Sequence, residues 1–389
     1  MRHTGYLSLF PSIASLLFAL SGPATAAPPP PFPPALDGWI LTTMQQNGYP
    51  GLSALVVRKG RVLWEGQYGY ALLEPPTPVD GRTLFMLAST AKTVTGAALL
   101  QLYEQGRIGL DDDVGSYAGF PVRNPQYPEV PITVRMLLNH TSGIRDTPGR
   151  LYGERLYSDG DSPIPLDLFL EGYLTGGTYH GDSYANFAPG TGYLYSNYAV
   201  ALAGLLVERI SGVPFEQYCQ EHIFEPLGMH DTSWFLAGLD PARIAMPYSC
   251  GGAGADKPEQ TCQAQGYYGY PDFPDGQLRT GARQLASFLM AMMGGGAYRG
   301  ARILESSTVD TIFRPNPLSG PGEVQGLVWY AQTFDSDLIW GHSGGDRGVN
   351  TSMFFRPSDG TGVILLANGW SLTGLDTLQA RLFREAAKR

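Results

Sequence analysis

Residues 85–106, FMLASTAKTVTGAALLQLYEQG, join a short apolar segment to a long helical pattern. The first four residues are typical of a strand. From Ser89 onward, apolar residues recur at the spacing of a helix that packs against a core. Gly106 is a favourable residue for ending such a helix. We therefore expect Ser89 to lie at the start of an apolar helix, directly after a strand-like segment.

Ser89 and Lys92 form a Ser-x-x-Lys pattern at this junction. Residues i and i+3 share one face of a helix, so the Lys92 amine is expected beside the Ser89 hydroxyl. A serine is a weak nucleophile until a neighbour takes its proton, and a lysine with a lowered pKa can do so. The helix N-terminus also favours negative charge at that point. The pattern predicts a nucleophile at Ser89 and a proton acceptor at Lys92.

A Tyr-x-Asn pattern occurs twice, as Tyr184-Ala185-Asn186 and as Tyr195-Ser196-Asn197. The second copy is the better candidate because it lies in a loop that opens a clear helical pattern. A tyrosine can act as a general base when ammonium groups lower its pKa, and an asparagine can hold a substrate amide. We interpret Tyr184 as an ordinary loop residue.

The run Gly341-His342-Ser343-Gly344-Gly345 matches the G-x-S-x-G elbow of the α/β-hydrolases. In that fold the order along the chain is serine, then acid, then histidine. No histidine follows His342, so Ser343 has no downstream base and the α/β-hydrolase interpretation fails. A glycine-rich strand edge remains as the structural alternative for this run.

Strand-like segments occur at both ends of the chain, and helical segments lie between them. The strand-like segments are residues 52–57, 62–68, 327–334, 338–342, 350–355 and 363–368. The clearest later helical patterns are residues 198–210, 282–293 and 373–387. We expect an α/β (α+β) fold in which both chain ends build one antiparallel sheet flanked by helices. The α/β lobe would cover about 36–88 and 300–389, with a mostly helical lobe at about 89–299 and a cleft between them.

The N-terminus has the features of an export signal. Arg2 precedes an apolar run at residues 6–20, and Ala24-Thr25-Ala26 is a small-residue cleavage site. The run has about 15 residues, fewer than the ~20 of a membrane helix. We expect a signal peptide at 1–26, a proline-rich linker at 27–35 and one catalytic domain at 36–389. We therefore expect a periplasmic or secreted protein without a stable membrane anchor.

The chain has three cysteines, and an exported chain meets an oxidising compartment. Cys250 and Cys262 flank a glycine-rich loop, so we expect a disulfide between them. Cys219 lies in an apolar-periodic helix and is expected as a buried thiol.

The composition of the 389 residues excludes several classes of protein. A hydrophobic share of 43% is too high for a disordered chain. The net charge of −9, without a basic cluster, argues against a nucleic-acid partner. No H-E-x-x-H motif or close histidine pair occurs, so we expect no metal site and no cofactor.

Together with the three motifs, several stretches resemble the serine β-lactamase and penicillin-binding protein superfamily, over roughly residues 36–388. The resemblance is closest to its class C-like branch of class C β-lactamases, D-alanyl-D-alanine carboxypeptidases, D-amino-acid peptidases and related carboxylesterases. The stretches are ITVRMLLNHTSGI (132–144), FAPGTGYLYSNYAVALAGLLVERISG (187–212), IFEPLGMHDTSW (223–234) and DGQLRTGARQLASFLMAMMGGG (275–296).

This resemblance implies a β-lactamase/transpeptidase-like fold and a role for each motif residue. Ser89 matches the acylated nucleophile, Lys92 its proton acceptor, and Tyr195 a tyrosine that shuttles protons. Asn197 matches the residue that binds the substrate amide. The backbone N–H groups of Ser89 and Gly345 would form an oxyanion hole, whose donors are worth several kcal/mol in the transition state.

One position departs from the family pattern, because His342-Ser343-Gly344 stands where Lys-Thr-Gly is usual. A histidine is mostly uncharged at neutral pH and is a poorer anchor for a β-lactam carboxylate than an ammonium. We therefore expect a D-alanyl-D-alanine carboxypeptidase-like or D-amino-acid peptidase, with a carboxylesterase or a β-lactamase as alternatives. Its partners would be a small peptide, ester or β-lactam, with peptidoglycan as a further one. A non-catalytic penicillin- or peptidoglycan-binding protein is the alternative of another class.

Overall fold

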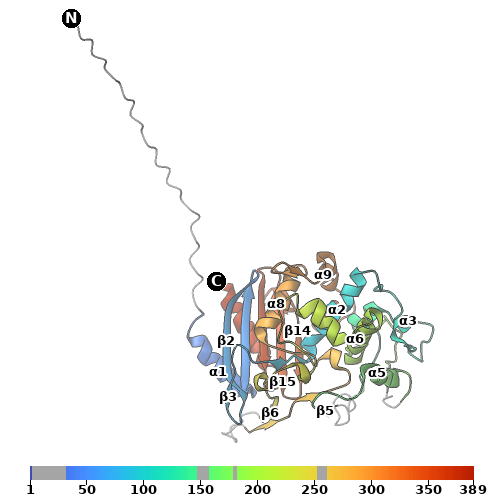
Figure 1. Ribbon diagram of the computed structural model, residues 1–389, viewed down its shortest axis with the longest axis horizontal. Coiled ribbons are helices and arrows are strands. Elements are labelled where there is room, and N and C mark those ends of the chain that lie inside the picture. The colour runs from blue at the N-terminus through green and yellow to red at the C-terminus, as the bar shows by residue number, and fades with distance from the viewer. Residues whose placement is uncertain (2–31, 147–156, 178–181, 252–260) are drawn as a thin grey trace. The chain divides into compact units, whose positions relative to one another are not determined.

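An eight-stranded antiparallel sheet forms the centre of the molecule, and its strands come from both ends of the chain (Figure 1). The computed structural model describes residues 32–146, 157–177, 182–251 and 261–389, together with Met1. Across the sheet the order is β12-β13-β14-β15-β16-β1-β2-β3. The strands are β1 (Gly51–Arg58), β2 (Arg61–Leu72), β3 (Thr77–Pro78), β12 (Glu323–Gln325), β13 (Tyr330–Phe334), β14 (Asp337–Asp346), β15 (Val349–Arg356) and β16 (Thr361–Ala367).

Strand β1 shows why the sheet is buried on both faces. Its side chains alternate between two cores, since successive residues of a strand point to opposite faces. Leu52, Ala54 and Val56 pack with helices α1 (Ala35–Asn47) and α10 (Gly374–Ala387). Leu55 and Val57 belong to the larger core on the other face, which α8 (Ala282–Met293) covers. Because both of its faces are buried, β1 is apolar along nearly its whole length.

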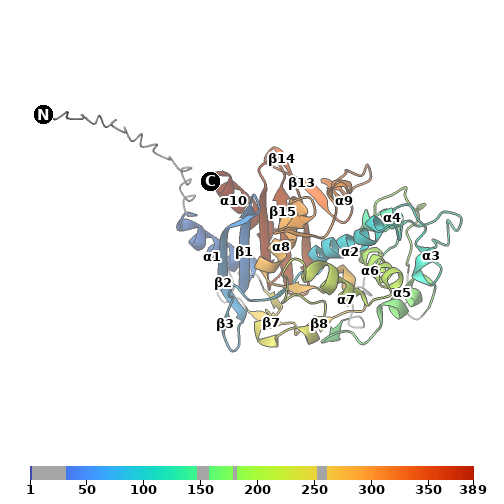
Figure 2. The same cartoon turned by 45° about the horizontal axis from the view of Figure 1, so that its top comes forward.

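The middle of the chain supplies helices that pack beside the sheet. Figure 2 shows α2 (Lys92–Glu104) and α6 (Asn197–Ser211) at the centre of this helical part. Around them lie α3 (Gly115–Ala118), α4 (Val134–Leu138), α5 (Leu166–Leu174) and α7 (Phe215–Cys219). Most of α2 and α6 is buried on every side, so their apolar residues face neighbours all around. The helix α9 (Ser306–Ile312) follows later in the chain.

The expected fold class is confirmed, since both chain ends pair in one antiparallel sheet around a helical middle. Several boundaries differ from the expectation. The helix expected from Ser89 begins as a 3-10 turn, η1 (Ala88–Ala91), and continues as α2. Strand β14 continues through the glycine-rich run to Asp346, where we expected it to end at residue 342. The helix α1 was not expected, and it begins at Ala35.

Residues Phe32–Lys388 form one compact unit. The expected signal peptide, apart from Met1, and most of the expected linker lie outside the described residues. None of the described helices is by itself long and apolar enough to cross a membrane. One pair, α6 with the segment 215–224, reaches that length and hydropathy when the two are taken together, and it is bent by 84°. Cys250 and Cys262 form a disulfide between β6 (Tyr248–Cys250) and β7 (Cys262–Ala264), and Cys219 is a buried thiol.

Candidate active site

Ser89 lies in the 3-10 turn η1, with an unusual backbone just before it. Ala88 has a φ of 47°, in the left-handed region that a residue with a side chain rarely adopts. Such conformations are held by their surroundings and gather at functional sites. Strand β14 lies against this turn, since a Cβ on Gly344 would be 2.4 Å from the Leu87 carbonyl oxygen and 3.0 Å from the Ser89 nitrogen. Only a glycine allows this approach without a shift.

Lys92 brings its ammonium group to Ser89, as the helical spacing predicts. The Nζ atom lies 3.0 Å from Ser89 Oγ, and the side chain is fully buried. Nζ also donates to the Asp275 carbonyl oxygen at 2.8 Å and to Asp275 Oδ2 at 3.1 Å. The three donors of the ammonium thus have three acceptors. Asp275, at the end of η5 (Phe273–Asp275), was not predicted from the sequence.

The ion pair with Asp275 changes the expected protonation of Lys92. Burial acts to lower the pKa of Lys92, but the charge of Asp275 and the contact with Tyr195 outweigh it, so that pKa lies above its ordinary value. This differs from the expectation of a lowered lysine pKa. Burial raises the pKa of the Asp275 carboxyl despite the nearby ammonium. The resting site therefore contains a charged Lys92 beside a carboxylate that is a stronger base than usual.

Tyr195 completes the group of side chains around Ser89. Its ring lies beside Lys92, with Nζ 5.3 Å from the ring centre, and Ser89 and Lys92 both act on the pKa of its hydroxyl. Burial raises the pKa of Tyr195, while Lys92 and Ser89 partly offset that rise. The His140 ring packs against Tyr195 with 4.4 Å between ring centres. His140 is uncharged, because burial and Lys92 hold its pKa well below the ordinary value.

Asn197 is positioned by the capped start of α6. The Asp146 carboxylate accepts hydrogen bonds from the backbone N–H of Asn197 at 2.7 Å and of Tyr198 at 3.2 Å, and from Ser196 Oγ at 2.9 Å. A carboxylate at a helix N-terminus satisfies free donors and complements the dipole. The Asn197 side chain is 6% exposed, and its Oδ1 atom has no hydrogen-bond partner within the described residues.

The glycine-rich run of β14 forms the opposite side of the site. Strand β13 pairs with β14 only as far as Gly341, so among the described strands residues 342–345 pair on one edge, with β15. The His342 ring is buried, and burial together with Lys92 lowers its pKa to about 3, so it is neutral. Its centre lies 6.2 Å from that of Tyr195. Ser343 Oγ pairs with the Tyr330 hydroxyl at 2.9 Å.

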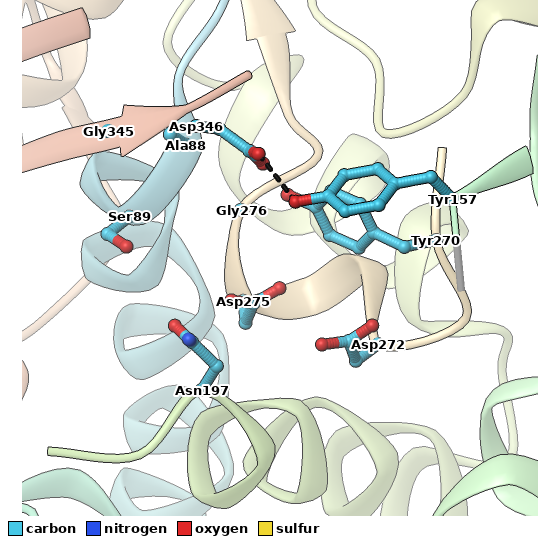
Figure 3. A pocket seen from close by; sticks show the side chains of 10 residues that line it. All are labelled: Ala88, Ser89, Tyr157, Asn197, Tyr270, Asp272, Asp275, Gly276, Gly345 and Asp346. Atoms are coloured by element: carbon cyan, nitrogen blue, oxygen red, sulfur yellow. Dashed lines mark hydrogen bonds between the residues drawn. The ribbon is translucent and has the colours of Figure 1, made fainter. Parts of the chain in front are cut away.

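A small pocket with a volume of about 20 Å³ opens beside Ser89 (Figure 3). Of the predicted site residues, Ser89, Asn197 and Gly345 line it. Lys92, Tyr195 and His342 are grouped next to Ser89. The other seven lining residues were not predicted: Ala88, Tyr157, Tyr270, Asp272, Asp275, Gly276 and Asp346.

The unpredicted residues had no usable signal in the sequence. Asp272 and Asp275 lie in a proline-containing turn without helical or strand period, and Asp275 is 183 residues from Lys92. The resembling stretch 275–296 begins at Asp275, but a linear motif does not show which side chain it meets. Tyr184 has the expected structural character, since it is buried and its hydroxyl donates to the Leu174 carbonyl oxygen at 3.3 Å. Among the described residues, no three His, Cys, Asp or Glu side chains are arranged to hold a metal ion.

Comparison with known proteins agrees with this geometry. The model of the family described as Beta-lactamase matches residues 36–388. Esterase EstB of Burkholderia gladioli is 32% identical over 223 residues, which are 56% of this chain and 54% of the esterase. Penicillin-binding protein 4* of Bacillus subtilis is 29% identical over 193 residues, 49% of this chain and 40% of that protein. The chain thus spans about half the length of these curated relatives.

Among solved structures, the D-amino acid amidase of Ochrobactrum anthropi SV3 has the same fold, with a TM-score of 0.73 and 22% identity. The match covers 91% of this chain and 99% of the amidase. The family match extends over nearly all of the described unit, and the Ser-x-x-Lys, Tyr-x-Asn and His-Ser-Gly segments all lie inside it. The chain therefore belongs to the Beta-lactamase family.

Proposed function

We propose that this protein is a serine hydrolase that cleaves an amide or ester bond through an acyl-enzyme on Ser89. The observation that carries the proposal is the 3.0 Å contact between Ser89 Oγ and Lys92 Nζ at the wall of an open pocket. A serine paired with a proton-transfer group, which a third group orients, is the usual arrangement for nucleophilic catalysis. Here Asp275 orients the lysine.

In the proposed reaction, Ser89 Oγ attacks the substrate carbonyl carbon and loses its proton. Lys92 takes that proton as it passes one of its own to the Asp275 carboxylate 3.1 Å away, so the lysine stays charged. Tyr195 then donates its proton to the leaving amine or alcohol and recovers one from Lys92, which Asp275 reprotonates. Water then attacks the acyl carbon as Tyr195 accepts a proton from it and passes its own proton to Ser89 Oγ, so that the carboxylic acid and free Ser89 are released.

The oxyanion of each intermediate would be bound by the backbone N–H groups of Ser89 and Gly345. Gly345 lies on the part of β14 that lines the pocket with Ser89, which supports this assignment. Ser343 and Gly344 would hold the substrate from the same strand segment, and Asn197 would bind its amide.

For the substrate, we favour a small peptide or amide of the D-alanyl-D-alanine carboxypeptidase or D-amino-acid peptidase type. The neutral His342 argues against efficient capture of a β-lactam carboxylate. A carboxylesterase is the second candidate, supported by the 32% identity to an esterase. The export-signal pattern and the disulfide support a periplasmic or secreted location, where peptidoglycan would be a further partner.

The test is covalent labelling of Ser89 combined with turnover. The native protein should react with a fluorescent fluorophosphonate and hydrolyse a member of a panel containing a D-Ala-D-Ala peptide, a D-aminoacyl amide, p-nitrophenyl esters and nitrocefin. Ser89→Ala should lose both labelling and hydrolysis, while Ser307→Ala, at an exposed position on α9, should keep both. Normal labelling of Ser89→Ala would overturn the proposal. A single burst of product without turnover would instead support a penicillin-binding protein.

A further inference from the structure

The pocket beside Ser89 has three carboxylate side chains in its wall, Asp272, Asp275 and Asp346 (Figure 3). Asp275 is paired with Lys92. Asp346 Oδ1 accepts hydrogen bonds from the Tyr157 hydroxyl and from the Arg347 backbone N–H, both at 2.7 Å. Asp272 is 3% exposed, and its neighbours include the carboxylates of Asp275 and Asp146.

The cations near this wall compensate the other carboxylates more than Asp272, since Arg279 and Arg347 act on Asp346 and Lys92 pairs with Asp275. Lys92 attracts Asp272 but donates its hydrogen bonds to Ser89 and Asp275, so it offsets one carboxylate of the group. A buried carboxylate is costly unless a cation or hydrogen-bond donors compensate it. Burial and the charge of Asp275 raise the pKa of Asp272 well above its ordinary range. The site around Asp272 therefore favours a positive charge from outside the chain.

Two further atoms of the same wall are acceptors without donors. Asn197 Oδ1 and Asp275 Oδ1 are buried, their residues are each 6% exposed, and neither atom has a hydrogen-bond partner within the described residues. A primary ammonium offers three donors and no acceptor, and so complements a carboxylate together with such oxygens. The ring of Tyr270 also lines the pocket, and aromatic rings attract cations. The ring of Tyr157 already has the Arg347 guanidinium 4.0 Å from its centre.

The carboxylates lie beside Ser89, and this position restricts which molecules with an ammonium group fit the pocket. In an α-aminoacyl group, one carbon separates the amine from the carbonyl that Ser89 would attack. An amine subsite must therefore share the pocket with Ser89, as Asp272 and Asp275 do. A substrate carboxylate in this pocket would be repelled instead.

We propose that this pocket is a subsite for the free ammonium group of the acyl donor, with Asp272 as its main ionic partner. Resting on the proposed function, this makes the substrates α-amino amides, esters or peptides with a free N-terminus. Donors with an acylated amine, such as the penultimate D-Ala of a D-Ala-D-Ala peptide, would be poor substrates, so the inference selects the D-amino-acid peptidase type from the proposed substrates. Asp272 acts here as a specificity residue that contacts the substrate.

The test compares D-phenylalanine p-nitroanilide with its N-acetyl derivative, and repeats the comparison with the L-enantiomers. In either the D- or the L-series, we expect the kcat/KM of the native enzyme to be about tenfold or more higher for the free amine than for the N-acetyl substrate. A difference of this size is typical for the loss of one charge-assisted hydrogen bond. Asp272→Asn should remove most of that preference by raising KM for the free amine, with the N-acetyl substrate unchanged. Asp310→Asn, at an exposed position on α9, is the matched control.

Fluorophosphonate labelling separates the possible failures. If the native enzyme is labelled at Ser89 but hydrolyses both substrates equally well, the ammonium subsite is wrong while the hydrolase proposal stands. If no labelling or hydrolysis occurs, the hydrolase proposal itself fails. A preference that a metal chelator abolishes would assign the acidic wall to a cation and overturn the inference. The substrate comparison on the native protein remains decisive even if Asp272→Asn does not fold.

Discussion

Asp275 is the residue whose side chain most changes the chemistry expected of the Ser89–Lys92 pair. A serine and a lysine one helical turn apart could be read from the sequence, and their 3.0 Å contact follows from the helix. The third member comes from a turn far along the chain, and only the fold brings it to Lys92. A sequence pattern predicts the geometry of residues that are close along the chain. A contact between distant segments depends on how all the helices and strands between them pack.

Asp275→Asn tests the proposed proton relay. The amide keeps an oxygen near Lys92 but loses the negative charge that accepts the lysine proton. We expect kcat to fall by roughly 10²-fold, within the usual range for a lost acid–base group. Because the Asp275 charge helps to raise the pKa of Lys92, that pKa should fall in the variant. The limb of the pH–rate profile that reports Lys92 should then move to lower pH.

The measurement is kcat against pH with a p-nitrophenyl ester, with Asp310→Asn as the control. A variant with a normal kcat and an unmoved profile would show that Asp275 only fills space beside the lysine.

At the scale of elements, β14 and the turn before α2 act together. The pattern predicted a strand at residues 338–342, with a glycine-rich strand edge only as the alternative for residues 341–345, and β14 continues through that run to Asp346. The pattern could not show what lies against this edge of the strand, because a glycine-rich run can face either solvent or a neighbouring backbone. The helices α2 and α6 were predictable because each is a long, largely apolar segment that ends near a glycine. The helix α1 was missed, because its start among prolines favoured an extended linker.

Gly344→Ala tests the close approach of β14 to the nucleophile turn. The added Cβ would lie 2.4 Å from the Leu87 carbonyl oxygen and from Thr351 Oγ1, so the strand must move away from Ser89. We expect the variant to lose most of its kcat and to melt at a lower temperature. Gly38→Ala is the matched control, because its Cβ meets nothing within 4 Å on a helix. That control should keep full activity and gain up to ~1 kcal/mol of stability. Unchanged kcat in Gly344→Ala would contradict the close fit.

In the whole molecule, two buried titratable groups make the free energy of unfolding change with pH in opposite directions. The pKa of His342 is about 3 in the fold and ~6.5 when unfolded, so the unfolded state binds more protons between these values. Its contribution is complete above pH ~6.5 and is lost as pH falls toward 3. Burial raises the pKa of Asp346 to about 6, so its contribution is complete below pH ~3.8 and is lost as pH rises to 6.

Two variants separate these trends in thermal melts between pH 3.5 and 7. His342→Gln should lose less stability than the native protein as pH falls from 6.5, because the group that must stay neutral is gone. Asp346→Asn should gain more stability than the native protein as pH rises from 4 to 6. Parallel melting curves for either variant and the native protein would mean that the group does not titrate in this way.

The pairing of β1 with β16 also has a consequence for how the chain folds. Leu52 lies opposite Ala367, so the hairpin of β1 and β2 keeps an unpaired edge until β16 has been synthesised. Such contacts between distant parts of a chain slow folding. The turn that contains Ser89 is synthesised well before its neighbour β14, so a nascent chain that has not yet reached β14 has no finished site. The proposed hydrolytic activity would therefore appear only after β14 has been made and has packed against that turn.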